Sequence, residues 1–115
     1  MTHPFEKTIH KVGLNKGITR IFIEGSELQV NKINRGEKFF KHFVDGKLIL
    51  DFFANESIKK NTVSKRGEMP VIDLTGKKIV ETFGKYSHFE AVYKNRNSEK
   101  TITIKPIKEK GKYNV

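Results

Sequence analysis

Two related stretches decide the fold: residues 18–25 read ITRIFIEG, and residues 69–76 read MPVIDLTG. They superpose when the chain is displaced by 51 positions. The same register pairs Val12 with Val63, Ile18 with Met69, Ile21 with Ile72, Ile23 with Leu74, Gly25 with Gly76 and Leu28 with Ile79. Displacement by 54 positions also matches Leu48–Leu50 with Ile102–Ile104. Similarity at a nearly fixed period indicates two copies of one structural unit.

The first copy begins with two extended segments and a short helix. β-branched and apolar residues favour strands over 8–12 and 18–23. Between them, the glycines of Gly13–Gly17 predict a flexible basic loop. Ser26 is expected to cap a helix over 27–31, because its hydroxyl can accept a bond from the first free backbone N–H groups.

A hairpin ends each copy. In the first copy, Asp45-Gly46 favours a two-residue type I′ turn between 39–44 and 47–52, because both central residues of that turn need positive φ. The second copy predicts a strand over 62–74, a helix over 77–83 ended by Gly84, and hairpin strands over 89–94 and 101–105 joined by a longer polar loop at 95–99.

The length of 115 residues suits one domain, since neither copy alone can bury its apolar face. We therefore expect a mainly β fold with short helices, of the α+β class, over residues 7–107. Repeat one spans 7–53, a linker spans 54–61 and repeat two spans 62–107. The basic end of the chain, 108–115, is expected to be disordered.

The charge balance points to a polyanionic partner. The 23 Lys and Arg residues outnumber the 13 Asp and Glu, which gives a formal net charge of +10. Residues 1–61 contribute eleven basic and seven acidic side chains, and 62–115 contribute twelve and six, so both halves are basic. Nucleic acid is the commonest such partner for a small protein. The absence of a long apolar run and of a signal-like start predicts no membrane partner and a cytoplasmic location.

The sequence favours a binding protein over an enzyme. There are no cysteines, and the four histidines, His3, His10, His42 and His88, show no metal-ligand spacing. No serine has a nucleophile-elbow context and no glycine pattern resembles a phosphate loop. We predict no catalytic residue, metal or cofactor. Asp73, inside an apolar strand, is expected to make a structural hydrogen bond to the adjacent loop.

Four segments of the first half carry a family resemblance: Lys11-Val12-Gly13, Arg20 to Gly25, Gly36-Glu37-Lys38 and Asp45 to Leu50. This pattern resembles the swapped-hairpin domain of the AbrB, MazE and SpoVT group of bacterial DNA-binding proteins, and is closest to the SymE-like branch. Pro70 to Leu74 is similar to a segment in regions attached to some DNA cytosine methyltransferases. In that group two modules exchange hairpins into one barrel-like body. The resemblance therefore implies a pseudo-dimeric barrel completed within a single chain, with further dimerisation open.

Two sets of candidate contact residues follow. Equivalent basic loops of the two halves, expected on one face, supply a nucleic-acid site made of His10, Lys11, Asn15, Lys16, Arg20, Lys65 and Arg66. Most phenylalanines are expected in the core. Adjacent Phe pairs at 39–40 and 52–53 place one ring of each pair on the opposite side of the chain, so Phe39 and Phe53 are candidates for a partner surface.

Two functions compete at this stage. The first is a DNA-binding protein of the AbrB-like type, acting as a small regulator or as a mobile-element or phage accessory protein on duplex DNA. The second is a protein-interaction or inhibitor module, such as an antitoxin or an anti-defence protein that binds a nuclease or toxin. The paired basic loops favour the first, and the surplus of phenylalanine favours the second.

Overall fold

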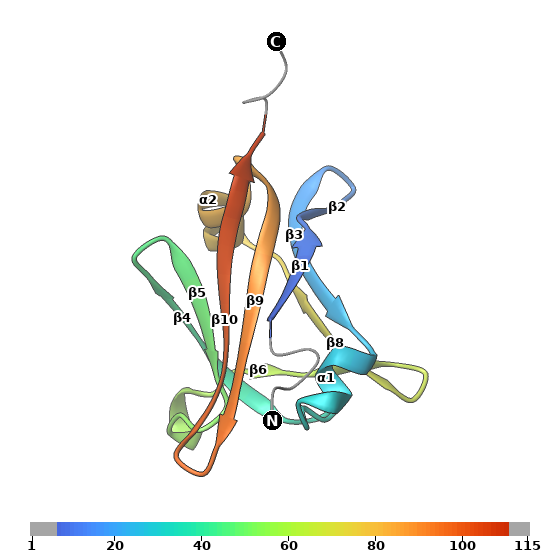
Figure 1. The fold of residues 1–115 in the computed structure, drawn as a ribbon, viewed down its shortest axis with the longest axis vertical. Coiled ribbons are helices and arrows are strands. Elements are labelled where there is room, and N and C mark those ends of the chain that lie inside the picture. The colour runs from blue at the N-terminus through green and yellow to red at the C-terminus, as the bar shows by residue number, and fades with distance from the viewer. Residues whose placement is uncertain (1–6, 111–115) are drawn as a thin grey trace.

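The computed structural model of the chain describes residues 7–110 and is mainly β with short helices (Figure 1). The first half consists of β1 (Lys7–Lys11), β2 (Gly13–Asn15), β3 (Ile18–Glu24), α1 (Ser26–Val30), β4 (Lys38–Val44) and β5 (Lys47–Asp51). The 3-10 helix η1 (Glu56–Ile58) then leads to β6 (Asn61–Thr62), β7 (Ser64–Arg66), β8 (Met69–Leu74), α2 (Lys77–Phe83), β9 (Tyr86–Arg96) and β10 (Glu99–Glu109). The order of strands and helix is the same in the two halves.

Each half completes its hairpin sheet with a strand from the other half. The larger sheet has the order β1-β9-β10-β5-β4-β6, and the smaller sheet has the order β2-β3-β8-β7. β1 of the first half pairs antiparallel with β9 of the second, and β6 of the second half pairs antiparallel with β4 of the first. The antiparallel pairs β3–β8 and β5–β10 also join the halves. Backbone hydrogen bonds therefore tie the halves together throughout.

The ladders between residues 7 and 110 form two sheets rather than one closed barrel. The chain passes from one sheet to the other at Val12, between β1 and β2, and at Val63, between β6 and β7. Both valines are anchored by backbone bonds, from Val12 N to Ser87 O at 2.9 Å and from Val63 N to Glu37 O at 2.8 Å. The expected barrel and the duplication of one unit stay predictions.

One apolar core joins the inner faces of the two sheets to the helices. Alternate residues of β3 and β8, including Ile21, Ile23, Ile72 and Leu74, face this core because successive side chains of a strand point to opposite sides. The larger sheet and the helices contribute Leu48, Leu50, Phe89, Ala91, Ile102, Ile104, Leu28, Ile79 and Phe83. The core therefore holds both sheets and both helices as one unit.

The loop predicted at Gly13–Gly17 is wrong, because these residues form half of a β-hairpin. Gly13–Asn15 pairs with Ile18–Arg20 as β2 against β3. The two residues of the turn, Lys16 and Gly17, both have positive φ, at 54° and 82°. Positive φ at both central residues is the geometry of a type I′ turn, and lysine at the first position gives a weaker sequence signal than the usual asparagine or aspartate.

The predicted helices are close to those observed. α1 begins one residue early: Ser26 is its first residue, and Gly25, with φ of 79°, takes the N-cap position without a side-chain bond. The bounds of α2 match the prediction. Gly84 directly follows α2, as predicted, and its φ of −62° is not the left-handed conformation that glycine often adopts at a helix end.

The two long hairpins were predicted with unequal success. Asp45-Gly46 forms the expected turn, with φ of 51° and 73°. The polar loop predicted at 95–99 is wrong, because β9 and β10 run to Arg96 and Glu99 and only two residues turn between them. Similarly, β10 extends into the predicted tail as far as Glu109, and Lys110 N donates to Lys85 O at 2.7 Å. Residues 111–115 of that tail lie outside the described residues.

The exchange of strands makes the halves interdependent. We expect residues 1–56, expressed alone, not to fold as a monomer, because β4 then lacks β6, and β1 lacks β9. Circular dichroism and the dispersion of amide NMR signals measure this directly. Addition of residues 57–115 should restore the native spectrum, whereas a stably folded monomer of the first half would contradict the dependence.

Candidate nucleic-acid interface

The two predicted basic loops lie at opposite ends of the smaller sheet (Figure 1). Each turn directly precedes one of the two central strands, β3 or β8, and those strands run antiparallel. The turn at Lys16-Gly17 therefore projects at one end of the sheet and the turn at Gly67-Glu68 at the other. The structure does not bring the predicted residues into one loop cluster.

Arg20 and Arg66 share the outer face of the smaller sheet, but acidic partners compensate both. Arg20 Nε and Nη2 donate to the two carboxylate oxygens of Asp73 at 2.8 and 3.0 Å, and the guanidinium lies 4.2 Å from the centre of the Phe22 ring. Arg66 Nη1 lies 3.4 Å from Glu24 Oε2. The predicted bond from Asp73 to a loop is wrong, because its partner is on the neighbouring strand. This face therefore carries little surplus charge.

The lysines and the asparagine of the predicted site do not share one surface. Asn15 lies opposite Ile18 on β3, so it faces the same side as Arg20. Lys65 lies opposite Pro70, one position from Arg66, and therefore faces the other side of the sheet. Lys16 is exposed at the tip of its turn. None of these residues completes a cationic cluster with the two arginines.

His10 faces the interior. Its ring stacks on Phe89 with centroids 5.1 Å apart, and its Nε2 lies 2.9 Å from Glu27 Oε1. Glu27 is only 8% exposed and also accepts hydrogen bonds from Thr8 Oγ1, at 2.8 Å, and from the Tyr93 hydroxyl. His10 thus belongs to a polar cluster that ties β1, α1 and β9 together, and it is not placed to contact nucleic acid.

The environment of Glu27 favours its ionised form. Burial by itself raises the pKa of a carboxyl group, but the hydrogen bonds from His10, Tyr93 and Thr8 outweigh burial here and lower the pKa of Glu27. Burial and the bond to Glu27 raise the pKa of Tyr93 in turn, so its hydroxyl remains a donor. A buried carboxylate with several donors is a satisfied structural charge.

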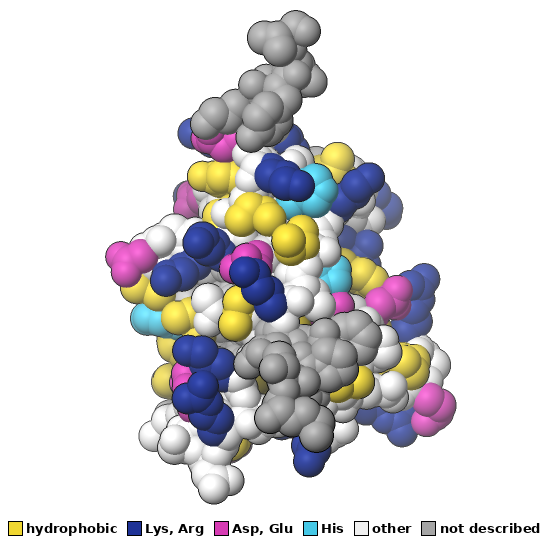
Figure 2. Space-filling model, viewed as in Figure 1, with side chains coloured by type: hydrophobic (Ala, Val, Ile, Leu, Met, Phe, Trp, Pro, Cys, Tyr) yellow, Lys and Arg dark blue, Asp and Glu magenta, His cyan; other side chains and the backbone are white. Residues whose placement is uncertain are grey.

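The outer face of the larger sheet is a second basic surface, which the sequence did not predict. Strand alternation and register place on it the basic side chains of Lys7, Lys11, Lys38, Lys47, Lys94, Arg96 and Lys105, and the acidic ones of Asp51, Glu90, Glu99 and Glu109. We call this surface the basic sheet face. Figure 2 shows Lys and Arg side chains spread over it, with hydrophobic side chains between them. The seven basic residues outnumber the four acidic residues on it.

The basic sheet face is long enough to follow a nucleic-acid backbone. Lys11 lies opposite His88 on β9, and Lys94 lies six residues further along that strand. At about 3.3 Å per residue this is roughly 20 Å, the length of about six phosphates at the roughly 3.4 Å axial rise of one DNA strand. Only Lys7 among these lysines has an ion pair between described residues, at 3.2 Å to Glu90.

Sequence reasoning found only Lys11 of this face. The other basic residues come from five strands, β1, β4, β5, β9 and β10, and only the register of the sheet aligns them. The sequence holds only a weak signal for this face. Lys94 and Arg96, like Lys7 and Lys11, are separated by an even number of positions within extended segments, which places each pair on one side of its strand.

Of the two phenylalanines predicted for a partner surface, the structure buries one and exposes the other. Phe39 is 1% exposed and packs on Phe52 with ring centroids 5.3 Å apart, so its assignment to a partner surface is wrong. The alternation of β4 turns Phe39 inward and Phe40 outward. Phe53 is 53% exposed, as expected.

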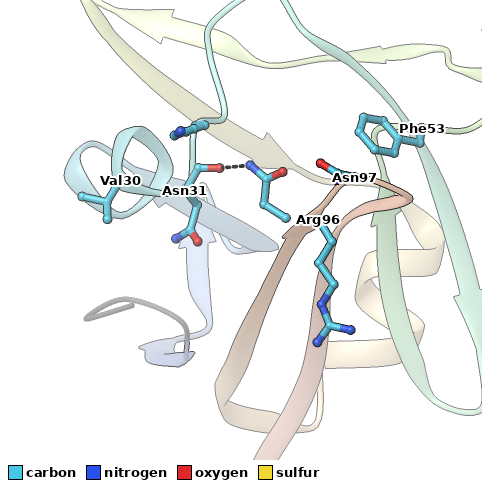
Figure 3. A pocket seen from close by; sticks show the side chains of 7 residues that line it. Val30, Asn31, Phe53, Arg96 and Asn97 are labelled. Carbon is cyan, nitrogen blue, oxygen red and sulfur yellow. Dashed lines mark hydrogen bonds between the residues drawn. The ribbon is translucent and has the colours of Figure 1, made fainter. Parts of the chain in front are cut away.

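Phe53 borders a pocket of about 500 Å³ at the β9–β10 turn. Figure 3 shows Phe53 and Val30 on opposite sides of this pocket, with Asn97 between them. Asn95 Nδ2 donates to Asn31 O at 2.9 Å and so joins the strand β9 to the end of α1. The lining is largely polar, and its amides already serve in part to hold the turn against α1.

The Glu27 cluster predicts a change in acid stability. The pKa of Glu27 is lower in the folded chain than in the unfolded chain, where it is about 4.3. The ionised Glu27 therefore stabilises the fold above the unfolded pKa. This stabilisation is lost as the pH falls through the folded pKa. Tyr93→Phe removes one donor, so we expect a loss of about 1.5–3 kcal/mol at pH 7. Between pH 7 and pH 3, the free energy of unfolding of the Tyr93→Phe variant should then fall by less than that of the parent protein.

Urea unfolding at both pH values measures this effect. Tyr86→Phe, on the same strand and outside the cluster, is the matched control. Equal losses on acidification for the parent protein and Tyr93→Phe would contradict the role assigned to Glu27.

Some site classes receive no support in the part of the chain that the structure describes. Between residues 7 and 110, no three His, Cys, Asp or Glu side chains are grouped so that they could hold a metal ion. No helix in that range is long and apolar enough to cross a membrane.

No protein-family model, curated protein or solved structure matches this chain.

Proposed function

We propose that the protein binds nucleic acid and that the basic sheet face carries the contact. The observation that carries this proposal is the surplus of basic side chains on one side of the larger sheet, of which Lys11, Lys47, Lys94 and Lys105 form no salt bridge with a described residue, although Lys105 lies opposite Glu90. Such uncompensated charges release counterions when they bind phosphates. The loops that the sequence favoured offer less, because Arg20 and Arg66 are already compensated.

The strand exchange supports a relation to the swapped-hairpin DNA-binding proteins. In our proposal each half is one module of that kind, and the pairs β1–β9 and β6–β4 are the exchange that two chains make in the related proteins. The order of elements is common to both halves, and the two crossing points, Val12 and Val63, fall at the same place in each. A single chain then forms the pseudo-dimer, and a role as a small DNA-binding regulator or a mobile-element accessory protein follows.

A fourfold substitution tests the proposal. Lys11, Lys47, Lys94 and Lys105 changed together to Gln should weaken binding to DNA by on the order of 100-fold at 0.15 M salt, and should reduce the slope of log K against log salt by roughly three to four. Fluorescence polarisation across a salt series gives both quantities. These lysines lie on the solvent side of the sheet, so thermal unfolding should change little.

The matched control removes the same charge elsewhere. Lys16, Lys65, Lys77 and Lys85 lie outside the basic sheet face, and their joint change to Gln lowers the net charge equally. This control should retain most of the salt slope. If both variants lose affinity equally, net charge alone drives binding and the assignment to this face fails.

A further inference from the structure

A pocket of about 420 Å³ opens on the basic sheet face itself. β4 and β5 form its floor, where Phe40 lies opposite Asp51 and His42 lies opposite Ile49. The segment after β5 closes one end with Ala54, Asn55 and Ile58. The pocket therefore lies among the lysines that we propose to contact phosphates, with Lys38 and Lys47 each two residues from a lining residue on the same side of its strand.

The lining offers ring faces and apolar surface. The rings of Phe40 and His42 lie with centroids 5.8 Å apart and planes inclined by 31°, His42 is exposed, and Ile58 is 42% exposed. Aromatic rings beside a cationic surface are the means by which proteins hold unstacked bases.

Two polar groups with unused bonding capacity complete the pocket. Asp51 Oδ1 accepts from Phe53 N at 2.9 Å, which leaves Oδ2 as an acceptor. Asn55 Oδ1 accepts from the backbone and hydroxyl of Ser57, both at 3.0 Å, which leaves the Nδ2 amide as a donor. No hydrogen bond between described residues uses either free group. A donor and an acceptor at the rim of an aromatic pocket match the mixed edge of a nucleobase.

We infer that this pocket takes one unstacked nucleobase and that the protein prefers single-stranded nucleic acid; the inference rests on the proposed function. A base in a duplex is stacked on both sides and paired at its edge, so it cannot enter. A base in a single strand can stack on Phe40 or His42 and reach Asp51 and Asn55 while the neighbouring phosphates lie near Lys38 and Lys47.

The test compares nucleic acids of equal length in polarisation titrations, and the intact and abasic single strands also carry equal charge. The probes are a 12-nucleotide DNA single strand, the same strand with abasic sites at every position, the matching duplex and an RNA strand of the same sequence. We expect the intact single strand to bind about tenfold tighter than the abasic strand, and tighter than the duplex, since one stacked base contributes roughly that factor. The RNA arm identifies which single strand is favoured.

Two variants locate the effect. Phe40→Leu keeps an apolar side chain on β4 but removes the ring, and His42→Ala changes an exposed residue outside the apolar core. Each should lower the preference for the intact strand over the abasic strand by severalfold. Phe53→Leu changes another exposed phenylalanine outside this pocket and should leave the preference unchanged.

The outcomes separate the inference from the proposed function. Equal affinity for intact and abasic strands, or a preference that survives both Phe40→Leu and His42→Ala, overturns the base pocket while salt-dependent binding to the basic sheet face stands. Tighter binding to the duplex than to the single strand also overturns it. If no probe binds at low salt, the proposed function fails and the pocket inference fails with it.

Discussion

The backbone ladders that each half gives to the other are the constraint on which the rest of the structure depends. A strand edge that is buried without a partner leaves N–H and C=O groups unsatisfied, at a cost of about 1–3 kcal/mol for each group. β1 satisfies β9, and β6 satisfies β4, so neither hairpin is complete within its own half. The ladder between β10 and β5 joins the two hairpins in one register, and this register decides which lysines share the outer face of the larger sheet.

Charge compensation then decides which surface is available to a polyanion. The smaller sheet carries two arginines, but Asp73 on the neighbouring strand holds Arg20 in an ion pair, and Glu24, two strands away, does the same for Arg66. On the larger sheet, Lys47, Lys94 and Lys105 have no such partner among residues 7–110. Exposed ion pairs add little stability, yet they remove the surplus potential that would attract a phosphate chain. Net charge by itself therefore favours a class of partner but does not locate the surface that would bind it.

Some features of the fold followed directly from local sequence. Asp45-Gly46 predicted its turn because few dipeptides accept positive φ at both residues. The helix predicted over 77–83 has the same bounds as α2. The turn at Lys16-Gly17 was missed because lysine seldom takes positive φ, so only the pairing of β2 with β3 fixes it. The length of the β9–β10 hairpin was missed because polar residues on a projecting hairpin resemble a loop.

The sequence by itself determined a basic, mainly β chain whose halves share one order of elements, because composition and hydrophobic period are local properties. Only the tertiary structure decided the roles of individual residues. It turned Phe39 inward, placed His10 against Glu27, and paired Arg20 with Asp73. The physical reason is that side-chain direction in a sheet alternates with every residue, so neighbours on a face are set by ladders between strands far apart in the chain.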